Sequence, residues 1–223
     1  MSALLFLLQA DGVYVATDSL SLAADTKKPF KYATKIFYLP HLQTIVCGTG
    51  SFDMVIDWYV LVQKNVVARN ILYLNEIAPA QLRDMSKRLG LPNELSSTIY
   101  HFGFLEEENR FVGYVYRSAK EYASEQLPYS VGFKPPDGIQ QEVVLKDVLD
   151  KGLPKGFVDL MKRQKEIDDA KPIQERLGIG GEVYFMVLNS SRAVMVTSHR
   201  FDDYMAVWNE MLENLKHPSE KQK

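Results

Sequence analysis

The fold is decided by the opening stretch Ser2-Ala-Leu-Leu-Phe-Leu-Leu-Gln-Ala-Asp-Gly-Val-Tyr-Val-Ala-Thr-Asp18-Ser19. Residues 3–8 are an apolar run, Asp11-Gly12 is a turn signal, and residues 13–17 are rich in β-branched and aromatic side chains. This order predicts a β-hairpin whose two strands are both largely buried.

Outside this stretch, strand and helix patterns alternate along the chain. A second hairpin is predicted at residues 35–39 and 44–47, and further strand pairs at 97–104 with 110–116 and at 182–188 with 193–198. Helical spacing predicts helices over residues 51–70, 79–89, 202–215 and 141–165, the last broken near Gly152. Residues 128–136 have the composition of a loop.

These elements predict the fold class and the domain count. Strand pairs joined by short turns favour antiparallel sheets, and helices that arrive in pairs favour helical layers on the outer faces. We expect an α+β fold, a four-layer αββα sandwich of two antiparallel sheets. No linker interrupts residues 1–217, which are expected to form a single domain, and residues 218–223 are expected to be a disordered tail.

The composition argues against several classes of function. The 26 Lys and Arg residues are balanced by 28 Asp and Glu among 223 residues, so the net charge of -2 gives no positive field for nucleic acid. The single cysteine, Cys47, cannot form an internal disulfide, and we expect a cytoplasmic protein. The apolar run 3–8 is too short for a membrane span, so no membrane association is expected.

Conventional cofactor and metal signatures are missing from the sequence. Its four histidines are scattered, and Cys47 has no partner at metal-site spacing. Gly178-Ile-Gly-Gly181 is followed by no P-loop lysine and leads into a predicted strand, so we interpret it as a turn. We expect neither a metal nor a cofactor.

Ser2 offers a less common kind of chemistry. It follows the initiator Met1, and a small residue in this position allows the methionine to be removed. A serine at a free N-terminus holds both a nucleophile and a base, because its α-amine has a pKa of about 8. A retained methionine would convert that amine into an amide and block it.

The surroundings of Ser2 resemble a known family. Proteasome β-type subunits and the related bacterial peptidase subunit, which are N-terminal-nucleophile hydrolases, have five features in this order: a hydroxyl residue, an Asp-Gly turn, an Ala-x-Asp-Ser tract, a lysine and a Gly-rich turn. The matching residues here are Ser2, Asp11-Gly12, Ala16-Thr-Asp18-Ser19, Lys35 and Gly48-Thr-Gly50. Phe111-Val-Gly-Tyr-Val-Tyr116 and Tyr129-Ser-Val-Gly132 also resemble later segments of those subunits.

The resemblance implies a role for four residues. Ser2 would be the nucleophile, Lys35 would lower the proton affinity of the Ser2 amine and hydroxyl, Asp18 would hold Lys35, and the Gly48 N–H would bind the oxyanion. Each residue alone has an ordinary explanation, as a strand-end turn residue (Asp18), an edge-strand charge (Lys35) or a helix-entry glycine (Gly48). The four in this order favour the catalytic interpretation.

Other positions depart from the family pattern. Phe133-Lys-Pro-Pro136 stands where active members carry a Ser-Gly pair that supports the terminal amine. Arg176 and Ile179 stand near places where many members carry Asp and Ser.

Three hypotheses about function therefore remain open. The first is a hydrolase that cleaves a peptide or amide bond through Ser2, and the second is a catalytically silent proteasome-like fold that acts in assembly or binding. The third is a small-ligand-binding domain unrelated to the family.

Self-association, as a ring or dimer, is expected from the resemblance. It is also expected from the predicted helix 51–70, where Trp58, Tyr59, Val62 and Val66 cover more of the circumference than one core face needs.

Overall fold

The computed structural model describes residues 3–23, 26–91, 96–136 and 138–216. These residues form two five-stranded antiparallel sheets, a two-stranded sheet and five α-helices, so the expected α+β class with antiparallel sheets is confirmed. The predicted tail 218–223 and the predicted nucleophile Ser2 lie outside the described residues.

The first sheet has the strand order β10-β1-β2-β11-β12 and the second has the order β5-β6-β7-β8-β9. The strands of the first sheet are β1 (Leu4–Leu8), β2 (Val13–Asp18), β10 (Ser130–Lys134), β11 (Glu182–Leu188) and β12 (Ala193–Arg200). Those of the second are β5 (Ile36–Leu39), β6 (Thr44–Thr49), β7 (Thr98–Leu105), β8 (Arg110–Arg117) and β9 (Ser124–Gln126). A short hairpin of β3 (Leu20–Leu22) and β4 (Pro29–Tyr32) lies between β2 and β5 in the sequence.

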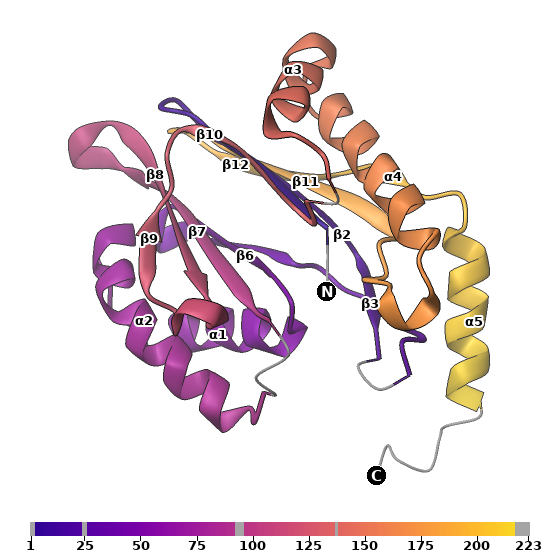
Figure 1. The fold of residues 1–223 in the computed structure, drawn as a ribbon. Helices are drawn as coiled ribbons and strands as arrows, with labels where there is room; N and C mark the ends of the chain where they lie inside the picture. Colours follow the sequence, from indigo (N-terminus) through magenta and orange to yellow (C-terminus); the bar gives the residue numbers. More distant parts are fainter. Residues whose placement is uncertain (1–2, 24–25, 92–95, 137, 217–223) are drawn as a thin grey trace.

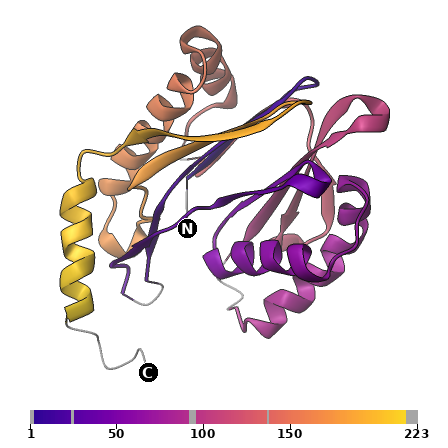
Figure 2. The same ribbon diagram turned by 180° about the vertical axis from the view of Figure 1, so that it is seen from behind.

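Four of the five helices pack against the two large sheets (Figures 1 and 2). Helices α1 (Phe52–Asn65) and α2 (Ile71–Arg88) pack on the second sheet, and α3 (Gln141–Lys151) and α4 (Lys155–Asp169) pack on the first. Helix α5 (Tyr204–Lys216) packs against β4, where the Tyr32 ring stacks on Tyr204 and Trp208.

The apolar run of β1 is buried because both of its faces lie in a core. Leu4, Phe6 and Leu8 belong to the cluster between the two sheets, together with Ile45 and Phe102 of the second sheet. Alternate residues of a strand point to opposite faces, and Leu5 and Leu7 accordingly belong to the cluster beneath α3 and α4.

Several elements differ from the sequence prediction: β3, β4 and β9 were not expected, and β10 and α2 differ most. The segment predicted as a loop contains β10, which pairs with β1; Gly132 lies opposite Phe6, and a Cβ atom at Gly132 would come within 2.2 Å of the Phe6 ring. Helix α2 begins at Ile71 rather than at Pro79, because the Asn70 side chain accepts hydrogen bonds from the N–H groups of Leu72 and Tyr73.

The α1 side chains that suggested a surface for self-association lie in or against the core of the second sheet. Trp58 and Val62 are fully buried against the second sheet, and the Tyr59 ring stacks on Phe37 with 4.7 Å between ring centroids. These three residues therefore pack in the core of the chain itself.

Within the described ranges, none of the helices has the length and apolar character needed to cross a bilayer.

Candidate active site

Asp18 ends the middle strand of the first sheet, and its carboxylate is completely buried. Oδ1 accepts hydrogen bonds from the Lys35 ammonium at 3.1 Å and from the Ala3 backbone N–H at 3.0 Å, while Oδ2 accepts from the Gly180 N–H at 3.3 Å. One carboxylate therefore connects the start of the chain, the residue before β5 and the loop before β11.

Lys35 is 3% exposed and directs its ammonium group at the end of β2. Besides the ion pair with Asp18, Nζ donates to the carbonyl oxygen of Leu20. A lysine side chain is rarely buried to this extent without a partner, and here it has both a charged and a neutral acceptor.

The electrostatics of the pair are dominated by burial. Loss of hydration lowers the pKa of the Lys35 ammonium and raises the pKa of the Asp18 carboxyl, and the attraction between the two groups opposes both shifts. Lys35 is consequently easier to deprotonate than a lysine in water.

The loop between α4 and β11 completes the surroundings of Asp18. The Gly180 carbonyl accepts from the N–H groups of Ser19 and Leu20, at 3.2 and 3.1 Å. Gly181 has a φ of +80°, and a Cβ atom there would lie 2.3 Å from Ser19 Oγ, so this position requires glycine. The segment from Gly178 to Gly181 is an irregular loop that leads into β11, and it packs against the site.

Asp168 anchors this loop from the end of α4. Its buried carboxylate accepts hydrogen bonds from two backbone N–H groups. Leu177 N–H donates to Oδ1 and Gly178 N–H donates to Oδ2, both at 2.9 Å. Sequence reasoning did not identify Asp168 and Gly180 as part of the site. The three glycines between residues 178 and 181 were the signal in the sequence that could have indicated a close backbone contact here.

Gly48 lies in β6, in register with Ile99 of β7. Gly48 directly follows Cys47, which pairs with Ile36, the residue after Lys35. A Cβ atom at Gly48 would lie 2.6 Å from the Thr98 carbonyl oxygen, so packing alone already requires glycine here.

Ala3, the residue after Ser2, is held by Asp18. Ala3 is fully buried, and its N–H is bound by the same Asp18 oxygen that binds Lys35. The described residues thus bring together Asp18, Lys35 and the immediate neighbour of Ser2, with Gly48 one strand away.

The residues at the departing positions have structural roles. Pro135 and Pro136 follow β10 and provide neither a hydroxyl nor an N–H group. Arg176 donates to the carbonyl oxygens of Lys171 and Asp169 and so caps the end of α4, while Ile179 is buried in the core beneath α3 and α4.

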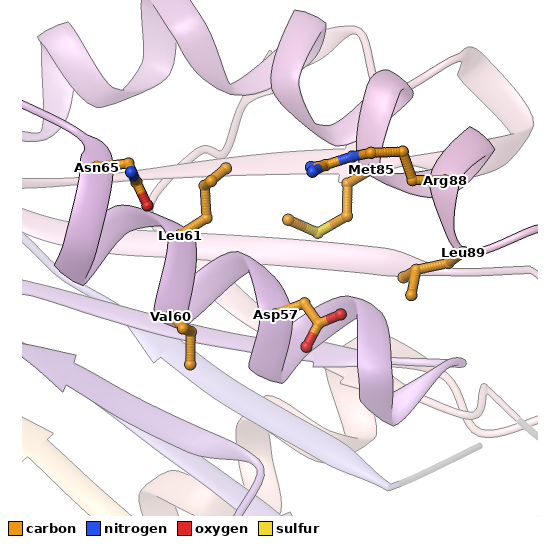
Figure 3. A pocket seen from close by; sticks show the side chains of 7 residues that line it. All are labelled: Asp57, Val60, Leu61, Asn65, Met85, Arg88 and Leu89. Carbon is orange, nitrogen blue, oxygen red and sulfur yellow. The ribbon is translucent and has the colours of Figure 1, made fainter.

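A pocket of about 260 Å³ lies elsewhere, between α1 and α2. Figure 3 shows Leu61, Met85 and Leu89 around it, with Asp57 and Arg88 contributed by different helices. None of its lining residues contacts Asp18 or Lys35, so it is separate from the candidate site. Over the described residues, no three His, Cys, Asp or Glu side chains gather as metal ligands would.

Comparisons with known proteins support the architecture. No family model matches the chain, and no curated protein matches it either. Among solved structures, Anbu (ancestral beta-subunit) from Yersinia bercovieri superposes with a TM-score of 0.59 over 99% of this chain and 99% of that chain, at 12% identity. The fold is proteasome-like. At this level of identity the likeness concerns the fold alone.

Proposed function

We propose that this chain is an N-terminal-nucleophile hydrolase that cleaves a peptide or amide bond through Ser2 after removal of Met1. The observation that carries the proposal is the shared Asp18 oxygen, which binds the N–H next to Ser2 and the ammonium of Lys35 at the same point. The proteasome-like fold supports it, and the proposal includes the four-layer αββα arrangement of residues 1–217 as one domain.

In the proposed reaction the Ser2 amine acts as the general base. It takes the proton from the Ser2 hydroxyl as the oxygen attacks the substrate carbonyl, and a C–O bond forms. The proton then passes to the leaving amine as the C–N bond breaks, which leaves an ester on Ser2. Water hydrolyses this ester and regenerates the free serine.

The other residues would act through charge. The Lys35 ammonium favours the deprotonated forms of the Ser2 amine and hydroxyl, and Asp18 keeps Lys35 charged and oriented. The Gly48 N–H would stabilise the oxyanion.

A second candidate is a catalytically silent scaffold of the same fold. It is favoured by Pro135 and Pro136, which cannot support a terminal amine with a hydroxyl, and by Arg176, which is engaged at the end of α4. In this alternative the Asp18–Lys35 pair stabilises the fold without serving chemistry.

Intact mass and turnover separate the two candidates. Intact mass shows whether Met1 is present, and a peptide aminocoumarin substrate measures amide cleavage. If the chain is a hydrolase, only the Met1-free protein releases coumarin, Ser2→Ala abolishes release, and the exposed-serine control Ser190→Ala retains it. Lys35→Ala should lower kcat by at least about 10²-fold, as expected for loss of acid–base assistance.

Equal release by Ser2→Ala and the Met1-free parent would contradict the proposal. No release from the Met1-free protein across a panel of peptide substrates would favour the scaffold.

A further inference from the structure

β12 is an open edge of the first sheet and pairs within the described chain with β11. Three successive apolar side chains on this strand are exposed: Val194 by 40%, Met195 by 45% and Val196 by 47%. Since successive strand residues point to opposite faces, both faces of the edge are apolar. An exposed apolar edge strand is a template for pairing with another strand.

The two cores on either side of the first sheet end at β12. Val196 pairs with Phe185, which lies in the core beneath α3 and α4. Met195 pairs with Met186, which lies in the core between the sheets. A further strand alongside β12 would extend both cores.

The hydrogen-bond pattern of the β11–β12 hairpin fixes which backbone groups face outward. Asn189 N–H donates to the Arg192 carbonyl oxygen at 3.0 Å, so these two residues form a hydrogen-bonded pair. Hydrogen-bonded and non-hydrogen-bonded pairs alternate along an antiparallel ladder. Ala193, Met195 and Thr197 therefore present their N–H and C=O groups to the free edge.

We propose that β12 pairs antiparallel with β12 of a second copy, about a two-fold axis at Met195. In this register Met195 faces the same residue of the partner, Val194 faces Val196, and Ala193 faces Thr197. The outward-facing residues meet each other, so they exchange backbone hydrogen bonds across the axis. One continuous sheet then runs through both copies.

The register explains why the partner is a second copy. A two-fold axis perpendicular to the sheet keeps each side chain on its own face, so apolar residues meet apolar residues on both faces. The flanking Arg192 meets Ser198, and no two like charges stand opposite each other.

The interface does not depend on the proposed hydrolase activity. Residues 193–197 alone offer less than the ~800 Å² per partner of a standard interface, so we expect dissociation in the micromolar range.

Sedimentation velocity from about 1 μM to 0.5 mM tests the interface. The parent should shift from monomer to dimer over this range. Met195→Lys places two ammonium groups opposite each other and should raise the dissociation constant at least about tenfold. The matched control Leu149→Lys, at an exposed apolar site on α3, should leave it unchanged.

Cysteine cross-linking tests the register. Directly opposed residues of a hydrogen-bonded antiparallel pair have Cα atoms about 5.5 Å apart, within disulfide range. With an added thiol oxidant, Met195→Cys should form a covalent dimer, and Val194→Cys alone should not. An equal mixture of Val194→Cys and Val196→Cys should again form one.

A parent that stays monomeric at 0.5 mM, or a Met195→Lys protein that dimerises as well as the parent, overturns the proposal. Cross-linking by Val194→Cys alone overturns the register.

Discussion

The Asp18–Lys35 pair and the Trp58–His101 pair are both sealed from solvent, but they are satisfied in different ways. Asp18 collects donors from three separate segments, and Lys35 adds a bond to Leu20. Trp58 Nε1 donates to His101 Nε2 at 2.7 Å, and within the described chain the other ring nitrogen of His101 has no hydrogen-bond partner.

The difference follows from charge. A buried ion pair requires several additional hydrogen bonds to offset its lost hydration, and loop backbone can supply them. In the neutral indole–imidazole pair one bond satisfies the Trp58 N–H and the accepting His101 Nε2, and flanking rings enclose the pair. The charged pair therefore brings together segments that are far apart in the sequence. A catalytic site also needs side chains from separate segments in one place.

The largest expected effect comes from breaking the charged pair. Lys35→Met leaves the Asp18 carboxylate buried without its counter-ion, and the free energy of unfolding should fall by about 3–5 kcal/mol in urea denaturation. Adding Asp18→Asn to Lys35→Met removes the stranded charge and should restore part of the loss. If Lys35→Met unfolds like the parent, the pair contributes nothing to stability.

The free energy of unfolding should depend on pH through His101 of the neutral pair. Burial lowers the pKa of His101 from 6.5 to about 3, so between these values the unfolded chain binds a proton that the folded chain does not. Stability is present above pH 6.5 and is lost as the pH falls, by about 2–3 kcal/mol between pH 6.5 and 4.5. His101→Gln should lack this contribution, and identical pH profiles for the two proteins would contradict the assignment.

Removal of the Trp58 donor should have a smaller effect. Trp58→Phe leaves His101 Nε2 buried without a partner and reduces the packed volume, at about 1–3 kcal/mol in thermal or urea unfolding. Trp208→Phe on α5 is a partly exposed control, which should change stability by less. A larger loss from the control would show that the Trp58–His101 bond is not the determining contact.

The smallest effect is expected at the anchor of the site loop. Asp168→Asn keeps the shape of the side chain but weakens its hydrogen bonds to Leu177 and Gly178, at about 1 kcal/mol. Amide exchange should speed up at Ser19 and Leu20, which donate to the Gly180 carbonyl, and stay unchanged at Val46 in the second sheet. Uniform acceleration across both sheets would indicate global destabilisation instead.

The sequence was informative where the signal is local. The β1–β2 hairpin follows from an apolar run, an Asp-Gly turn and a β-branched run, whereas Asp18 and Lys35 were singled out by the resemblance to proteasome β-type subunits. β10 was missed because its glycine and flanking prolines resemble a loop, and its pairing with β1 spans most of the chain. The Gly180 contact was missed for a similar reason, since it joins residues 162 positions apart.

The buried Asp18–Lys35 pair has an evolutionary consequence. Replacement of either member alone strands a charge in the interior, so selection for a folded chain retains both residues whether or not catalysis persists. Position 2 carries no such constraint from the pair. A lineage that lost its chemistry would keep its aspartate and lysine while the residue after the initiator methionine drifted. Variation at that single position among relatives would therefore separate active descendants from silent ones.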